Sequence, residues 1–197
     1  MKIVVDSKDY NFKADKRLLI PYMEEGRRYG IDIVKVGLMD KNGNVIQEAK
    51  YDFVFGESIE PDDIVVLGTI IDINDKIPYS AKPYIKCTFN AYNVSKGMIL
   101  EGFDSFTIST DKKVITVHTN SSWGALNSYG EWVIPYGQYT WIDGFDKGFV
   151  RARIGTVTSG QKNNDAKWSL ITDGGIIVYS ECHDIKPFYG KGLDYIP

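Results

Sequence analysis

Two short stretches of this chain hold side chains that could do chemistry. The first is Cys182, His183 and Asp184, which together offer a nucleophile, a base and an acid. Neighbouring residues of a strand point to opposite faces, so His183 would face away from the other two. A catalytic triad needs side chains that converge in space, and adjacency in sequence does not supply that. We therefore expect no catalytic residues and no enzyme activity.

The second stretch is a stripe of cations and aromatic rings. Arg151 and Arg153 alternate along one predicted strand, so they share a face, and alternation also sends Tyr139 and Trp141 to one face. Guanidinium groups hold phosphates and carboxylates, and flat rings beside them suit a sugar, a nucleobase or a protein partner. We predict a binding site at Trp141, Arg151 and Arg153, with Tyr136 and Tyr139 beside it. The alternative is a solvated sheet face with core rings.

No cofactor or metal is expected. The loop Glu57 to Asp63 carries carboxylates, which Ca²⁺ prefers, but it lacks the spacing of an EF-hand. Cys87 and Cys182 are the two cysteines and lie too far apart in sequence for a CxxC site. The chain also has no GxGxxG, Walker or GxSxG motif.

The composition favours strands joined by tight turns. The chain of 197 residues has 13 Tyr, 9 Phe, 4 Trp and 19 Gly, and aromatic side chains suit a pleated surface. A formal net charge of -3 gives no global positive field, so we expect no binding to a nucleic-acid duplex. Apolar runs are too short for a signal core or a membrane span. If Met1 is the native start, we expect a cytoplasmic protein.

Three stretches repeat one pattern. In each, a large apolar residue is followed seven positions later by a glycine, at Gly43, Gly130 and Gly175, and an apolar segment comes next. Such self-similarity indicates one supersecondary unit used several times. Each glycine ends a polar turn, so we predict a hairpin with positive φ at the glycine. The leading residues are Val36, Trp123 and Trp168. We expect the two tryptophans to be structural equivalents, mostly buried.

The hairpins continue into further strands, which suggests a single repeat domain over 1–197. We expect a cap at 1–35 and repeats at about 36–73, 123–157 and 167–190. A degraded copy at 84–118 would have Gly97 as its turn glycine and Phe103-Asp104 where the first copy has Tyr51-Asp52. The loops at 56–63 and 158–166 are the predicted insertions, and unshared loops of this kind are candidate binding segments.

These residues resemble the WG repeat, also called the KWG repeat, of bacterial proteins. Trp123-Gly124, Gly130 and Val133-Ile134-Pro135 match its pattern. The first copy matches from Gly37 to Tyr51-Asp52 with Val36 in place of the tryptophan, and the third keeps Trp168 but has Ser169 in place of the glycine. The resemblance implies an all-β repeat array that is non-enzymatic and serves as an interaction surface.

We therefore expect an all-β fold of repeated antiparallel hairpin or meander units, arranged either like propeller blades or as a curved open array. The expected function is that of a non-catalytic binding or scaffold protein of a bacterium or its virus, which mediates a protein–protein interaction. The alternative is a small-molecule binder that captures an anionic or aromatic ligand such as a nucleotide. The sequence leaves the partner and the oligomeric state open.

Overall fold

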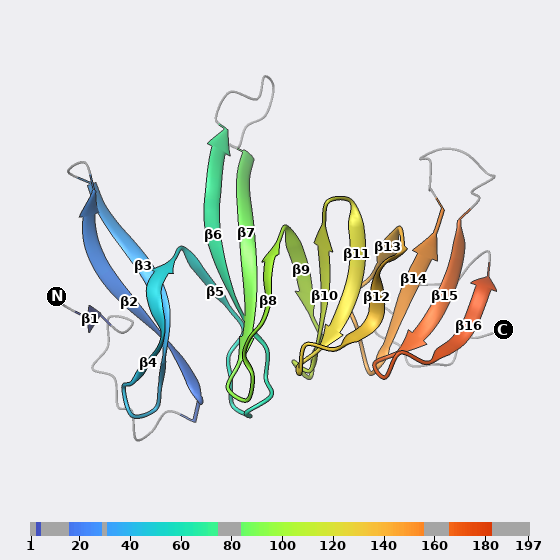
Figure 1. Ribbon diagram of the computed structural model, residues 1–197, viewed down its shortest axis with the longest axis horizontal. Helices are drawn as coiled ribbons and strands as arrows, with labels where there is room; N and C mark the ends of the chain where they lie inside the picture. The colour runs from blue at the N-terminus through green and yellow to red at the C-terminus, as the bar shows by residue number, and fades with distance from the viewer. Residues whose placement is uncertain (1–2, 5–15, 29–30, 75–83, 156–165, 183–197) are drawn as a thin grey trace. The chain divides into compact units, whose positions relative to one another are not determined.

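The protein is all-β. The computed structural model describes residues 3–4, 16–28, 31–74, 84–155 and 166–182. Its strands form four antiparallel sheets of four strands each, and within every sheet the strands follow one another in chain order (Figure 1). The chain divides into two compact units, 1–104 and 105–197, with two sheets in each. The described residues contain no helix long and apolar enough to cross a membrane.

Unit 1 contains sheets 1 and 2. The strands of sheet 1 are β1 (Ile3–Val4), β2 (Leu19–Arg28), β3 (Ile31–Asp40) and β4 (Val45–Tyr51). The strands of sheet 2 are β5 (Phe53–Phe55), β6 (Val65–Asn74), β7 (Tyr84–Asn93) and β8 (Gly97–Phe103).

Unit 2 contains sheets 3 and 4. The strands of sheet 3 are β9 (Ser105–Ile108), β10 (Val114–Thr119), β11 (Ser122–Asn127) and β12 (Trp132–Tyr139). The strands of sheet 4 are β13 (Trp141–Ile142), β14 (Phe149–Ile154), β15 (Lys167–Thr172) and β16 (Ile177–Cys182).

One residue joins the two sheets of each unit. In unit 1 it is Asp52, whose backbone N–H donates to Gly68 O at 2.8 Å and whose side chain accepts from Ile70 N at 2.9 Å. In unit 2 it is Thr140, whose N–H and hydroxyl both donate to Arg153 O, at 2.8 and 2.9 Å. Both residues tie the crossing chain to the second strand of the next sheet. The repeats at 36–73 and 123–157 therefore each span two sheets, beginning in the third strand of one.

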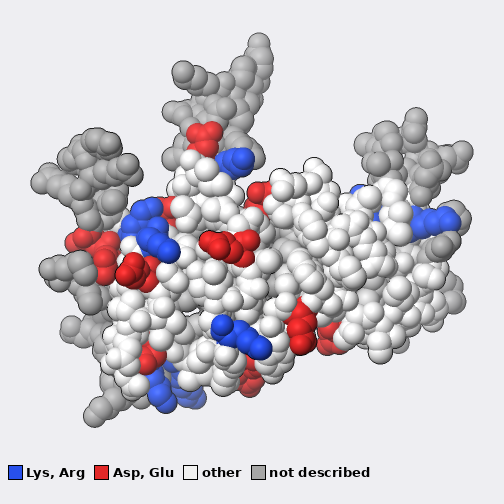
Figure 2. Space-filling view, in the orientation of Figure 1, with Lys and Arg blue, Asp and Glu red and all other residues white. Residues whose placement is uncertain are grey.

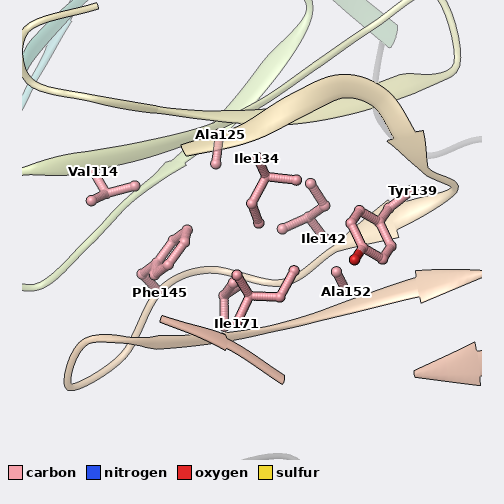
Figure 3. Packing of buried hydrophobic residues seen from close by; sticks show 9 residues of the cluster. Val114, Ala125, Ile134, Tyr139, Ile142, Phe145, Ala152 and Ile171 are labelled. Atoms are coloured by element: carbon pink, nitrogen blue, oxygen red, sulfur yellow. The ribbon is translucent and has the colours of Figure 1, made fainter. Parts of the chain in front are cut away.

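The two sheets of a unit pack through apolar side chains. In unit 2 the residues of this core come from both sheets and point toward one another (Figure 3), and they are Val114, Ala125, Ile134, Tyr139, Ile142, Phe145, Val150, Ala152 and Ile171. The corresponding core of unit 1 is Leu19, Leu38, Tyr51, Val65, Leu67 and Tyr92. Because side chains alternate along each strand, every second residue points into this core. The residues between them lie on the other face of the sheet.

The predicted turn glycines are confirmed. Gly43, Gly130 and Gly175 have φ values of 84°, 81° and 81°. Each N–H donates to the carbonyl three residues earlier, at 3.0, 3.0 and 2.9 Å. This left-handed conformation is open to glycine and costly for other residues, so the shared spacing in the sequence has a backbone cause.

The degraded copy has the expected turn, but its register differs by one residue. Gly97 has a φ of 73°. The pair Ala91↔Leu100 corresponds to Leu38↔Gln47, however, and this equivalence places Lys96 where the first copy has its turn glycine. It also places Phe89 at the position of the leading apolar residue, Val36 in the first copy.

The shift follows from contacts of this turn. The backbone N–H groups of Val94 and Ser95 both donate to Pro61 O, at 3.1 Å each. The side chain of Asn93 accepts from Lys96 N at 2.7 Å, inside the turn. Because the turn is held against the loop that precedes β6, its geometry differs from that of the free hairpin turns.

The glycine of the Trp-Gly pair is required by close packing. A Cβ on Gly124 would lie 2.5 Å from the Trp132 ring and 3.0 Å from Tyr136 Cα. A Cβ on Gly37 would lie 2.5 Å from Gln47 O and from the Tyr22 ring. The fourth strand and an aromatic ring thus cover this position in both copies, and a side chain there would displace them.

Candidate binding face

A row of side chains crosses sheet 4. The register pairs Trp141 with Arg153, Arg153 with Trp168 and Trp168 with Cys182, so each strand of the sheet contributes one member. Directly paired residues of antiparallel strands share a face. Their neighbours Ile142 and Ala152 lie in the core between sheets 3 and 4, so the row lies on the opposite side. We call this side the outer face of sheet 4.

Two arginines contact the indole rings of this row. The Arg153 guanidinium carbon lies 5.8 Å from the centre of the Trp141 ring and 5.5 Å from the centre of the Trp168 ring. The Arg151 guanidinium carbon lies 4.6 Å from the centre of the Trp168 ring. Cations at these distances are attracted to the ring faces, and indole is the strongest such acceptor. Arg153 is therefore flanked by an indole on each side.

Arg151 is neutralised within the face. Its Nε donates to Asp143 Oδ2 at 2.7 Å, and its Nη2 lies 2.5 Å from the same oxygen. The other oxygen, Asp143 Oδ1, accepts from Trp141 Nε1 at 2.8 Å. The carboxylate thus holds one arginine and orients one indole. The Arg151 side chain is 11% exposed and the Asp143 side chain 30%, so the pair is largely shielded from water.

Arg153 has no such counterion. No carboxylate of the described residues forms an ion pair with it, and its Nε atom is buried without a hydrogen-bond partner. Buried polar groups are nearly always hydrogen-bonded, so an exception of this kind requires an explanation. The outer face of sheet 4 therefore carries one unmatched positive charge, fixed between two rings.

The row continues onto sheet 3. The ring centres of Trp123 and Trp141 are 4.7 Å apart, and those of His118 and Trp123 are also 4.7 Å apart. Trp123 and Trp168 occupy equivalent positions, since they pair with the last residues of β12 and β16. The structural equivalence is confirmed. Both are mostly but not fully buried, as expected. Trp123 packs against the core between sheets 3 and 4, whereas Trp168 contacts the two arginines.

The two predicted tyrosines lie elsewhere. Tyr139 is 4% exposed and belongs to the core, so it does not share an exposed face with Trp141, which is 41% exposed. Alternation fails here because Tyr139 ends sheet 3, Trp141 begins sheet 4, and Thr140 turns the chain between them. Tyr136 is exposed, and its hydroxyl donates to Thr119 O. It approaches β11 on the side of the Gly124 hydrogens, opposite to Trp123.

The sequence prediction thus found three residues of the face and missed two. Trp141, Arg151 and Arg153 lie together as expected, whereas Trp168 and Asp143 complete the arrangement. Trp168 was assigned to the repeat pattern and hence to the core. Asp143 lies two residues after Trp141, on the same side of a strand, and that spacing was the available signal.

The other chemical candidates make local hydrogen bonds or lie outside the described residues. The Cys182 thiol is half-buried and donates to Ser180 O at 3.7 Å, whereas His183 and Asp184 lie outside the described residues. In the acidic loop, Asp63 is buried and accepts from Ile59 N and Glu60 N at 2.8 and 2.9 Å, which is a turn-forming role. The part of the chain that the structure describes contains no cluster of three metal-ligating side chains. Of the predicted insertion 158–166, all but the last residue lies outside it.

Charge is scattered over the face of the molecule that Figure 2 shows. Figure 2 shows Lys and Arg interspersed with Asp and Glu among the described residues, over a surface that is mostly neither. A surface that binds a nucleic-acid backbone instead gathers Lys and Arg on one face. Recognition at the outer face of sheet 4 must accordingly depend on a few placed groups rather than on a broad field.

Comparison with known proteins finds a family model that is similar to two segments of the chain. The family model described as "WG containing repeat" matches residues 37–58 and 123–155. The first segment runs from the third strand of sheet 1 into the loop after β5, and the second from β11 to the end of β14. A search of the curated proteins finds no match. Each compact unit therefore contains one segment that is similar to the WG repeat.

Proposed function

We propose that this chain is a non-catalytic binding protein that mediates a protein–protein interaction through the outer face of sheet 4. The observation that carries the proposal is Arg153, an arginine without a counterion held between Trp141 and Trp168. Arginine and tryptophan dominate the binding energy of protein interfaces, where they lie in shielded positions near the centre. The WG repeats supply the scaffold. The row of Trp141, Arg153, Trp168 and Cys182 occurs in unit 2 alone among the two units.

Residues that the copies share are used for folding. The turn glycines meet a backbone requirement, and Gly37 and Gly124 meet a packing requirement. Arg153 meets neither, because the corresponding position of unit 1 is Gly68. Function is expected at such differences, since a residue needed by every copy is not free to be selected for a partner.

The experiment is affinity capture from a lysate of the source organism with the full chain as bait. Trp141→Ala and Arg153→Gln test the face, and Lys41→Gln in the exposed turn of unit 1 is a control with the same change of charge. We expect a protein that the wild type and the control retain and that both face variants lose. Equal capture by all four baits would contradict the proposal, provided that circular dichroism shows all of them folded.

A second candidate function is the capture of a small planar anion such as a nucleotide. It is favoured by the same arrangement, because a guanidinium beside two indoles offers both charge and stacking. Thermal shift with AMP and ATP tests it, since a ligand that binds only the folded state raises the melting temperature. The cytoplasmic location and the bacterial or viral origin that we expect from the sequence stay predictions.

A further inference from the structure

On the outer face of sheet 4, the described side chains include one more cation than carboxylate. Arg151 and Asp143 form a shielded ion pair, and both oxygens of Asp143 are already engaged, by Arg151 and by Trp141 Nε1. Arg153 adds a second positive charge that no carboxylate of the described residues meets. The face thus has a net charge of one unit at a defined place.

The buried Nε of Arg153 shows that this charge is incompletely satisfied. Among the described residues it is the buried side-chain nitrogen that lacks an acceptor. Leaving a buried donor unpaired is costly, and more so when the group is charged. Because this nitrogen is shielded, a partner would reach the guanidinium through the exposed part of the Arg153 side chain, which is only partly buried.

The indoles also hold the guanidinium in place. Trp141 and Trp168 flank it through direct register pairs on either side, and Asp143 fixes the orientation of Trp141. A preorganised donor loses little conformational entropy on binding. The planar fork of arginine presents two parallel N–H groups, which match the two oxygens of a carboxylate.

A carboxylate fits this position better than a phosphate. Asp143 is already paired with Arg151, so Arg153 leaves one unbalanced positive charge among the described side chains of the face. A phosphate group carries nearly two negative charges, of which this cation would balance only one. One unmatched cation also balances one carboxylate.

Resting on the proposed function, we infer that Arg153 receives an aspartate or glutamate side chain of the protein partner, seated between Trp141 and Trp168. The partner residue forms paired hydrogen bonds to the guanidinium, and the indoles exclude water from the pair. Arg151 serves as a positioning residue, since its charge is met by Asp143 and its guanidinium packs on Trp168.

The test uses a library of random twelve-residue peptides displayed on phage, selected on the full chain. Selected peptides are synthesised with each acidic residue in turn replaced by its amide. Their affinities are measured for wild type, Trp141→Ala, Arg153→Gln, Arg153→Lys and the control Lys41→Gln. Circular dichroism establishes that each variant folds.

We expect one acidic residue per peptide whose replacement weakens binding about ten-fold or more, and an equal loss for Arg153→Gln. The two changes together should cost no more than either alone, because they remove the same pair. Arg153→Lys keeps the charge and should still lose several-fold, whereas Lys41→Gln should bind like wild type.

Two other results overturn the inference in different ways. Peptides that bind through Trp141 but tolerate both the amide replacements and Arg153→Gln would remove the carboxylate and leave the proposed function standing. Failure of any peptide to bind in a Trp141-dependent manner, together with Arg153-dependent binding of AMP or ATP, would overturn the protein partner itself in favour of the small-molecule function.

Discussion

The second sheets of the two units use the same row of positions in different ways. In unit 1 the row is Phe53, Gly68, Phe89 and Phe103, and in unit 2 it is Trp141, Arg153, Trp168 and Cys182. A Cβ on Gly68 would lie 2.7 Å from the Phe89 ring and 3.3 Å from the Phe53 ring. In unit 1, therefore, flat rings close over a glycine, whereas in unit 2 they stand on either side of an arginine.

The positions next to this row are likewise apolar in unit 1 and charged in unit 2. Phe55 and Val66 in unit 1 correspond to Asp143 and Arg151 in unit 2, and Val66 is fully buried. An apolar packed face has thus been replaced by an ion pair and an unmatched cation at identical places in the ladder. The fold requires side chains that occupy these positions. It does not require that those side chains be apolar or charged. The row in unit 2 is where the scaffold acquires a specific property.

Exchanging the central residues should give the largest effects. Gly68→Arg forces a charged side chain between packed phenylalanines, and we expect a loss of about 4 kcal/mol or more in the free energy of unfolding. The reverse change, Arg153→Gly, should cost only about 1 kcal/mol, through backbone entropy and lost ring contacts. Urea denaturation followed by circular dichroism measures both. Similar losses for the two variants would mean that the rows are equally packed.

The turn glycines should also separate the two units. Gly43 and Gly175 have nearly the same φ, but a Cβ on Gly43 meets nothing within 4 Å, whereas one on Gly175 lies 2.6 Å from Val133 O. Gly43→Ala should cost about 1 kcal/mol from the left-handed backbone alone. Gly175→Ala should cost about 2–4 kcal/mol, because the clash with a carbonyl oxygen adds to it. Equal melting temperatures for the two variants would rule out the contact with Val133.

Alkaline pH should destabilise unit 1 first. The hydroxyls of Tyr51 and Tyr92 are hydrogen-bonded at 2.6 Å, and burial, followed by this bond, raises the pKa of Tyr92 above its ordinary value of 10.0. The unfolded chain then loses the proton at a lower pH than the folded chain does. Stability is therefore complete below pH 10 and falls above it, by about 1.4 kcal/mol per pH unit at most.

Unit 2 provides the comparison, since it has Ile171 where unit 1 has Tyr92. Tyr92→Phe should flatten the alkaline dependence of unfolding measured between pH 9 and 11.5. A wild type whose unfolding midpoint stays constant over that range would contradict the account.

Making the two rows more alike should have the smallest effect. Trp141→Phe places the aromatic residue of unit 1 at an exposed position and removes the hydrogen bond to Asp143. We expect a loss of about 0.5–1 kcal/mol, the usual value of one hydrogen bond. A loss several times larger in urea denaturation would show that Trp141 supports the fold and is unsuited to serve as a surface for partners.

The sequence predicted what is determined locally. A polar turn that ends in glycine imposes its conformation within a few residues, so Gly43, Gly130 and Gly175 could be recognised without the fold. Alternation within a strand likewise placed Arg151 and Arg153 on one face. The strands around the third copy could be assigned for the same reason, because the hairpin pattern is short and repeated.

What the sequence did not predict depends on contacts between distant residues. Tyr139 and Trp141 belong to different sheets because Thr140 bonds to β14, and no pattern within the segment records that bond. The register of the degraded copy depends on a carbonyl of Pro61, some thirty residues earlier in the chain. Trp168 contacts Arg151 only through the pairing of β14 with β15.

The chain-order arrangement of the strands has a consequence for how the protein forms. Every sheet pairs strands that follow one another in sequence, so most native contacts close short loops, and short loops lose little entropy on closing. During synthesis, the strands of unit 1 can therefore pair before those of unit 2 have left the ribosome, since domains fold as units from the N-terminus. The row that carries Arg153 is then completed last, when β16 pairs with β15.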